Sequence, residues 1–117
     1  MRWPVALAGG LLALAGTAPA PGWGASFDCA KARTTVEKTI CGHPVLDAQD
    51  TELGRLYRTL RRRLAPHQAQ ALRDDQRQWL RLRGALCPAS KAACLQVEYA
   101  ERNADLTARL QDLEPRR

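Results

Sequence analysis

Four cysteines have the most sharply defined chemistry in this chain of 117 residues. They form two close pairs separated by a long interval, at positions 29, 41, 87 and 94. In a short exported chain, four cysteines indicate two disulfides, for which three connectivities exist. We expect local pairing, Cys29 with Cys41 and Cys87 with Cys94.

Geometry supports the first of these pairs. A helix from Thr35 to Cys41 is roughly 10 Å long, and extended residues from Cys29 to Thr34 can run back over that distance. A zinc site is the alternative, but zinc ligands usually come in close pairs such as Cys-x-x-Cys or His-x-x-x-His. The chain has neither pair, and His43 and His67 lie far from matching partners. We therefore expect no metal and no cofactor.

Catalytic motifs are missing from the sequence. It contains no G-x-S-x-G elbow, no H-E-x-x-H pair and no glycine-rich phosphate loop. The neighbouring carboxylates Asp74 and Asp75 would diverge by about 100° on a helix, so they cannot flank one bond. With all four cysteines oxidised, no thiol nucleophile remains. We expect no catalytic residues and no enzymatic activity.

A run of arginines is the strongest charge signal. The segment "RLYRTLRRRL", residues 55–64, carries five arginines in ten residues. Arg55, Arg58 and Arg62 point away from the apolar stripe of this helix, so they form a candidate face for an anionic partner. The alternative is a solvated face, because acidic residues precede the arginines on the same helix, as the helix dipole favours.

Several polar residues fall where helical periodicity predicts burial. Gln76 and Arg83 share a stripe with Trp79, and Arg102 lies on the stripe of Tyr99. Buried charges require partners, so these residues predict an internal polar network that fixes the helix register. The alternative is a ligand pocket.

The register of the last two predicted helices suggests specific pairs within this network. Counting outward from the turn between Cys87 and Cys94 places Arg83 beside Glu98, and Trp79 opposite Arg102 as a cation-π pair. The candidate residues for a polar network or a binding site are Asp50, Tyr57, Gln76, Trp79, Arg83, Glu98 and Arg102.

The N-terminus reads as a secretory signal peptide. Arg2 precedes an apolar run from Val5 to Ala15 that is too short to span a bilayer, and small residues follow it. We assign residues 1–20 to the signal peptide, with cleavage between positions 20 and 25. Cys29 follows "SFD", which is not a lipobox. We therefore expect a soluble periplasmic or secreted protein, the alternative being an uncleaved anchor.

Apolar residues beyond position 34 recur at helical rather than strand spacing, which predicts an all-α fold. Thr34 and Glu37 form a capping box that opens a short helix ending at Gly42. Three longer helices should follow, at about 44–64, 68–86 and 92–113, the last two as an antiparallel hairpin. Gly54, inside the second helix, indicates close packing or a tolerated weakness. Together the four helices make a small helical bundle. We place this domain at residues 26–113 and a C-terminal tail at 114–117.

Four segments in combination resemble successive blocks of the lysozyme inhibitor LprI-like family of small exported bacterial proteins. They are "FDCAKARTTVEKTIC", "LDAQDTELGRLYRTL", "QRQWLRLRGALC" and "CLQVEYAERNADL". The resemblance implies a helical, disulfide-stapled domain of the cell envelope, and some members are credited with inhibiting lysozyme. The matching positions are the cysteines together with Phe27, Asp28, Lys31, Ala32, Glu37, Ile40, Leu46, Asp50, Leu53, Tyr57, Gln76, Trp79, Arg83, Leu95, Tyr99, Arg102 and Leu106.

Net charge bears on which partner binds. The chain carries a formal charge of +6, or +5 once Arg2 leaves with the signal peptide. Animal-type lysozymes are also basic, so their approach would not be steered electrostatically. A local contact remains open: His43, in the "CGHP" turn, could reach the carboxylate pair of a glycoside hydrolase. The expected partner is lysozyme or another envelope protein; the alternative is an anionic cell-wall polymer or lipid, and nucleic acid is not expected.

Overall fold

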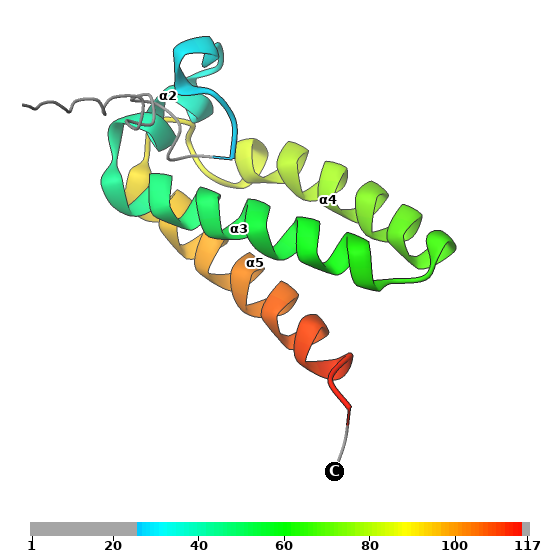
Figure 1. The fold of residues 1–117 in the computed structure, drawn as a ribbon. Coiled ribbons are helices and arrows are strands. Elements are labelled where there is room, and N and C mark those ends of the chain that lie inside the picture. Colours follow the sequence, from blue (N-terminus) through cyan, green and yellow to red (C-terminus); the bar gives the residue numbers. More distant parts are fainter. Residues whose placement is uncertain (1–25, 116–117) are drawn as a thin grey trace, which may run out of the picture.

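The computed structural model describes residues 26–115, and in that part of the chain all regular structure is helical (Figure 1). The elements are the 3-10 turn η2 (Cys29–Lys31) and the helices α2 (Thr35–Gly42), α3 (Pro44–Arg63), α4 (Pro66–Leu86) and α5 (Ala92–Asp112). The predicted all-α fold with one short and three longer helices is confirmed. The predicted signal peptide lies outside the described residues.

The segment before α2 is a turn, not the extended chain expected from the sequence. The Asp28 carboxylate accepts a hydrogen bond from the Ala30 amide at 3.0 Å, and this contact caps η2. At the start of α2, the Thr34 hydroxyl accepts from the Glu37 amide at 3.0 Å, and the Glu37 carboxylate accepts from the Thr34 amide at 3.1 Å. The predicted capping box is therefore formed.

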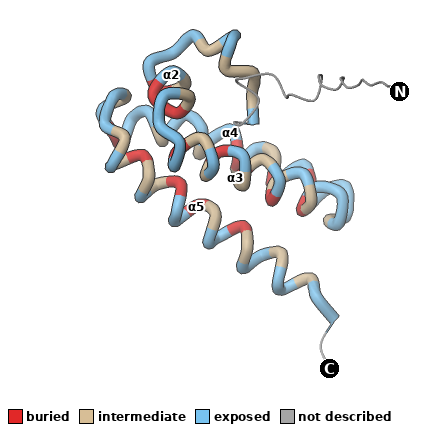
Figure 2. Tube along the Cα trace, turned by 60° about the vertical axis from the view of Figure 1, so that its left-hand side comes forward, coloured by how far each residue is buried: buried red, intermediate tan, exposed pale blue. Residues whose placement is uncertain are grey.

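Helix α3 is the centre of the fold. It packs most extensively against α5 and also contacts α2 and α4. Buried positions recur along α3 and α5 at helical intervals (Figure 2), because each helix turns one apolar stripe inward. The buried apolar core consists of Val36, Ile40, Leu46, Leu53, Leu56, Leu60, Leu72, Cys87, Leu95, Tyr99 and Leu106.

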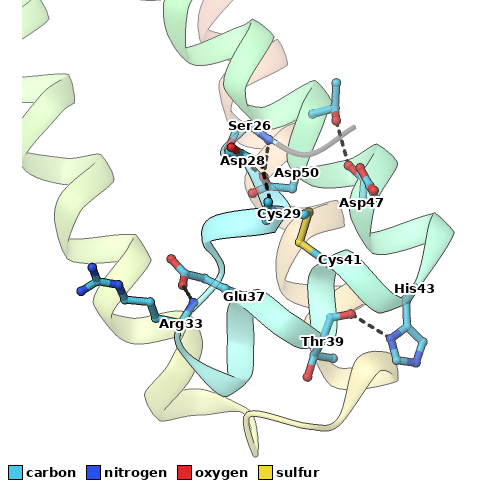
Figure 3. The surroundings of a disulfide bond; sticks show 12 residues. Ser26, Asp28, Cys29, Arg33, Glu37, Thr39, Cys41, His43, Asp47 and Asp50 are labelled. Carbon is cyan, nitrogen blue, oxygen red and sulfur yellow. Dashed lines mark hydrogen bonds between the residues drawn. A yellow bond between two sulfur atoms is a disulfide. The ribbon is translucent and has the colours of Figure 1, made fainter. Parts of the chain in front are cut away.

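Both disulfides have the predicted local pairing. The Cα atoms of Cys29 and Cys41 lie 5.9 Å apart, and those of Cys87 and Cys94 lie 5.7 Å apart. The first disulfide ties η2 to the end of α2 (Figure 3), and the second closes the connection between α4 and α5. In the chain-entropy model, loops of these lengths contribute roughly 2.5 to 3 kcal/mol each.

Helices α4 and α5 run antiparallel from the second disulfide, but their backbones approach each other less closely than either approaches α3. The positions of α4 that face α5 carry Gln76, Trp79 and Arg83, and these long side chains span the gap between the two helices. The predicted hairpin is therefore bridged by side chains instead of being closely packed.

Gly54 is a site of close packing. A Cβ atom at this position would lie 2.8 Å from the Ser26 Cβ atom, which is closer than side chains tolerate. We expect Gly54→Ala to destabilise the protein by about 1 kcal/mol, although alanine favours a helix interior by a similar amount, because Ser26 must move. Chemical denaturation measures this change. Gly84→Ala is the matched control: its Cβ atom would meet only Val36, at 3.6 Å, so this variant should gain stability.

Glu37 makes part of the stability dependent on pH. Hydrogen bonds from the Arg33 amide, at 2.8 Å, and the Thr34 amide lower the pKa of the Glu37 carboxyl. A group whose pKa is lowered by folding stabilises the protein above its unfolded pKa, near 4.5, and this contribution is lost as the pH falls through the folded pKa.

We expect Glu37→Gln to lose about 0.5 kcal/mol of unfolding free energy at pH 7 and little at pH 3. Urea unfolding at the two pH values measures the difference, with Glu101→Gln on the exposed surface of α5 as the control. Equal losses at both pH values would contradict a role for the charge.

Candidate functional site

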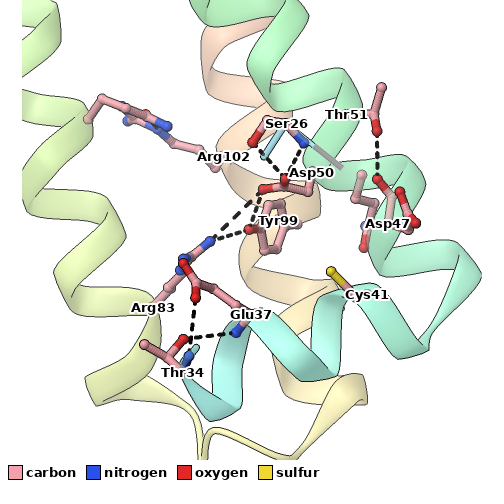
Figure 4. Close-up of polar contacts among 12 residues, drawn as sticks. Ser26, Thr34, Glu37, Cys41, Asp47, Asp50, Thr51, Arg83, Tyr99 and Arg102 are labelled. Carbon is pink, nitrogen blue, oxygen red and sulfur yellow. Dashed lines mark hydrogen bonds and ion pairs between the residues drawn. The ribbon is translucent and has the colours of Figure 1, made fainter. Parts of the chain in front are cut away.

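A buried carboxylate lies at the centre of the polar network. Asp50 is only 2 % exposed, and its Oδ2 atom accepts hydrogen bonds from the Ser26 amide and hydroxyl, both at 2.7 Å (Figure 4). Its Oδ1 atom accepts from the Tyr99 hydroxyl at 2.7 Å, and the Arg83 guanidinium lies 4.0 Å away. Both oxygens of Asp50 therefore have donors, as a buried carboxylate requires.

Arg83 reaches Tyr99 and not Glu98. Its guanidinium donates to the Tyr99 hydroxyl, which in turn donates to Asp50. Burial raises the pKa of Tyr99, so the hydroxyl keeps the proton that it donates. The structure brings Asp50, Arg83 and Tyr99 together from three helices, whereas Glu98 is half-exposed and outside this contact, because it lies about 100° around α5 from Tyr99.

A second polar cluster surrounds Arg102, which is 6 % exposed. The Gln76 Oε1 atom accepts from two nitrogens of Arg102, at 3.1 and 2.8 Å. The carboxylates of Asp75 and Asp105 accept from the same guanidinium at 3.1 and 3.3 Å, and Arg109 also contacts both carboxylates. This charged side chain therefore lies among partners supplied by α4 and α5.

Trp79 links the two clusters. Its ring meets the Tyr99 ring edge-on with 5.0 Å between centroids, and the Arg102 guanidinium lies 5.9 Å from the Trp79 ring. The predicted opposition of Trp79 and Arg102 is thus present in the structure. Most of the predicted network residues meet here, but Tyr57 forms no hydrogen bond with either cluster in the described range 26–115. It lies farther along α3, with the Arg61 guanidinium 5.8 Å from the centre of its ring.

Sequence reasoning missed five members of these clusters. Tyr99 is predicted only as a residue of the apolar stripe, although its hydroxyl joins Arg83 to Asp50 and a buried tyrosine hydroxyl needs a partner. The other four are Ser26, Asp75, Asp105 and Arg109. Three of them carried a signal that could have been used. Asp105 lies three residues after Arg102, Arg109 lies four residues after Asp105, and Asp75 precedes Gln76, so helical spacing favours their contact. Ser26 carried no such signal, because it precedes the first helix.

The arginine face is exposed as predicted. Arg55, Arg58 and Arg62 all lie on the outer side of α3. Arg55 is paired with Glu52 at 2.6 Å, whereas Arg58 and Arg62 form no ion pair with any residue in the range 26–115. Tyr57, Arg58, Arg61 and Arg62 line a shallow hollow on this face.

The turn that contains His43 lies beside the first disulfide. The His43 side chain is exposed, and its Nδ1 atom lies 2.8 Å from the Thr39 carbonyl oxygen (Figure 3). A carbonyl oxygen can only accept, so Nδ1 is the donor in this contact and Nε2 is the ring nitrogen left for another molecule. The turn can therefore present one polar group to a partner.

Neither a free thiol nor a metal-site cluster is present among residues 26–115. The four cysteines are oxidised in pairs, so none offers a thiolate to a substrate or a metal. Within residues 26–115, no cluster of histidine, cysteine or carboxylate side chains has the composition of a metal site. None of the helices in that range is long and apolar enough to cross a membrane.

Comparison with known proteins identifies the family. Residues 28–113 match the family described as "Lysozyme inhibitor LprI". No curated protein and no solved structure matches the chain. The matched range runs from the cap of η2 to the residue after α5, so it includes both disulfides and all members of the two polar clusters except Ser26. The chain belongs to the LprI lysozyme-inhibitor family.

Proposed function

We propose that this chain is an exported binding protein that inhibits lysozyme. The match to the family over residues 28–113 is the observation that carries the proposal. Inhibition by binding needs a surface held in one shape, since ordering a flexible surface on association reduces the affinity. Two disulfides and two buried polar clusters supply that rigidity here.

The proposal includes export and processing. Residues 1–20 would act as the signal peptide, and the domain over 26–113 would work in the periplasm or outside the cell, where disulfides persist. The signal-like composition of the N-terminus and the two disulfides support this location. No catalytic role is proposed for any residue.

The turn at His43 is the candidate contact loop. A basic lysozyme would meet a chain of net charge +5 once Arg2 has left with the signal peptide, so a local contact must compensate for the missing long-range attraction. The exposed His43 ring, with its Nε2 atom unused by the Thr39 contact, could accept a hydrogen bond from a protonated carboxyl in the lysozyme cleft.

Inhibition of an animal-type lysozyme by the oxidised protein without residues 1–25 tests the function. We expect inhibition that saturates at one molecule per lysozyme and persists at physiological salt. His43→Ala should weaken inhibition by roughly tenfold, the effect of about 1.4 kcal/mol. His67→Ala, an equally exposed histidine at the start of α4, is the control. If His43→Ala inhibits lysozyme as strongly as the natural chain, the loop at His43 is not the contact. If the natural protein inhibits lysozyme at neither low nor physiological salt, the proposed function is wrong.

A second candidate function rests on the arginine face. Arg58 and Arg62 are exposed and have no ion-pair partner among residues 26–115, which favours binding to an anionic cell-wall polymer or lipid. Such binding should weaken steeply with salt, unlike the specific inhibition of an enzyme. Cosedimentation with phosphatidylglycerol vesicles at low and physiological salt, for the natural chain and for Arg62→Gln, measures it.

A further inference from the structure

A cleft between α3 and α4 has unused hydrogen-bond donors on its walls. Its volume is about 290 Å³. It is lined by Ser26, Asp50, Leu53, Gly54, Tyr57, Arg58, Gln76 and Leu80. Asp50 takes no part in what the cleft can bind, because both of its oxygens already accept hydrogen bonds from Ser26 and Tyr99.

Gln76 supplies the first donor. This side chain is 8 % exposed, and its Oε1 atom is used by Arg102 through two hydrogen bonds. Those bonds fix which end of the side-chain amide is oxygen, so the amide NH2 is the group left over. It has no acceptor in the part of the chain that the structure describes. Because Gln76 lines the cleft, this amide group can donate to a ligand that brings an acceptor.

Tyr57 and Arg58 supply the other donors. Tyr57 lines the cleft, and its hydroxyl forms no hydrogen bond with another residue in the range 26–115. The Arg58 guanidinium folds back along its own helix: its Nη1 atom lies 3.1 Å from the place where a Cβ of residue 54 would be. Because position 54 is glycine, this guanidinium can lie at the mouth of the cleft. The cleft thus offers one positive charge and two neutral donors.

We propose that this cleft binds a carboxylate group carried on a carbon stem, such as an acidic side chain or the ring of an acidic sugar. The planar guanidinium of Arg58 matches the two oxygens of a carboxylate, and Tyr57 and Gln76 can donate to the remaining lone pairs. Leu53 and Leu80 provide apolar walls for the stem. A doubly charged phosphate fits less well, because the cleft carries one uncompensated cation and the charge of Asp50 lies behind it.

This site is distinct from the proposed contact with lysozyme, and the inference does not depend on that function. It refines the second candidate function, because it places recognition of an acidic group in a formed cleft and not on the open face. The face would attract any polyanion, whereas the cleft would select a single carboxylate by shape and by donor geometry.

Nuclear magnetic resonance titration tests the proposal. The probes are a glutamate capped at both ends, the capped glutamine as its neutral isostere, glucuronate, and inorganic phosphate. We expect the side-chain amide resonances of Gln76 to shift saturably with the capped glutamate or with glucuronate, and not with the capped glutamine. The more strongly bound of the two carboxylates identifies the source as peptide or sugar.

Matched variants separate the cleft from general charge. Arg58→Gln should weaken carboxylate binding by roughly tenfold and Tyr57→Phe by about threefold, as expected for a charged and a neutral hydrogen bond. Arg62→Gln removes the same charge from the same helix outside the cleft, and should change the affinity by less than about twofold. Circular dichroism confirms that each variant is folded.

Three results would overturn the proposal: no saturable shift at Gln76 with either carboxylate, equal losses for Arg58→Gln and Arg62→Gln, or tighter binding of inorganic phosphate. Lysozyme inhibition by the same variants is a separate measurement. Because the cleft is independent of the His43 turn, Arg58→Gln should inhibit lysozyme as the natural chain does, so failure of one proposal can be told from failure of the other.

Discussion

Asp50→Ala should destabilise the protein by about 3–5 kcal/mol, the usual loss when one member of a buried charged network is removed. The substitution leaves the Ser26 amide and the Tyr99 hydroxyl without their acceptor and leaves Arg83 without its nearest carboxylate. For a domain of this size, such a loss lowers the melting temperature by roughly 15 °C or more. Thermal and urea unfolding of the oxidised protein measure both quantities.

Two further variants distinguish the charge of Asp50 from its shape. Asp50→Asn keeps one acceptor oxygen and nearly the same volume, so its loss should be intermediate. Asp74→Ala removes a carboxylate whose side chain is 63 % exposed, and it should change the unfolding free energy by less than about 0.5 kcal/mol. If Asp50→Ala were as mild as Asp74→Ala, the network would not be holding the three helices together.

Arg102→Ala should cost about 3–4 kcal/mol of unfolding free energy, the second largest effect that we expect. The guanidinium satisfies the buried Gln76 oxygen through two hydrogen bonds and neutralises Asp75 and Asp105. Removing it leaves a buried acceptor unpaired and opens a cavity beside Trp79. Urea unfolding at neutral pH gives the value.

A double-mutant cycle tests whether the loss of stability in Arg102→Ala comes from the contact between Arg102 and Gln76. In the pair Arg102→Met and Gln76→Leu, both polar partners are replaced by apolar side chains of similar size, so the double variant should lose less than the sum of the two single variants. Arg109→Ala is the control, since this arginine contacts the same carboxylates but is 43 % exposed, and its loss should stay below about 1 kcal/mol. Additive losses in the cycle would mean that Arg102 and Gln76 do not depend on each other.

Asp50 and Arg102 support the fold beneath the proposed binding surfaces and are not proposed to contact a partner themselves. Asp50 and Arg102 direct their polar atoms at other groups of the same chain, and both are more than 90 % buried. Lysozyme inhibition per folded molecule should therefore be unchanged in Asp50→Asn at a temperature where this variant is folded. A specific loss of inhibition would instead place Asp50 at the contact.

The sequence by itself determined the features that depend on local spacing. The capping box follows from the spacing of three residues between Thr34 and Glu37. The apolar stripes and the inward orientation of Gln76 and Arg102 follow from the rotation of about 100° per residue along a helix. Disulfide pairing followed because the distance between Cys87 and Cys94 along the chain is short. The position of Trp79 opposite Arg102 across the hairpin followed from counting residues outward from that disulfide.

Tertiary structure alone decided which polar atoms meet. Periodicity places Tyr99 and Glu98 about 100° apart on α5, but the position of α4 relative to α5 decides which of the two Arg83 reaches. The path of the chain before η2 decided that Ser26 would lie on Gly54 and cap Asp50. The cleft with Tyr57, Arg58 and Gln76 exists only because α3 and α4 pack at one particular angle. Local spacing specifies the face of a helix, whereas contacts between faces depend on the positions of whole helices.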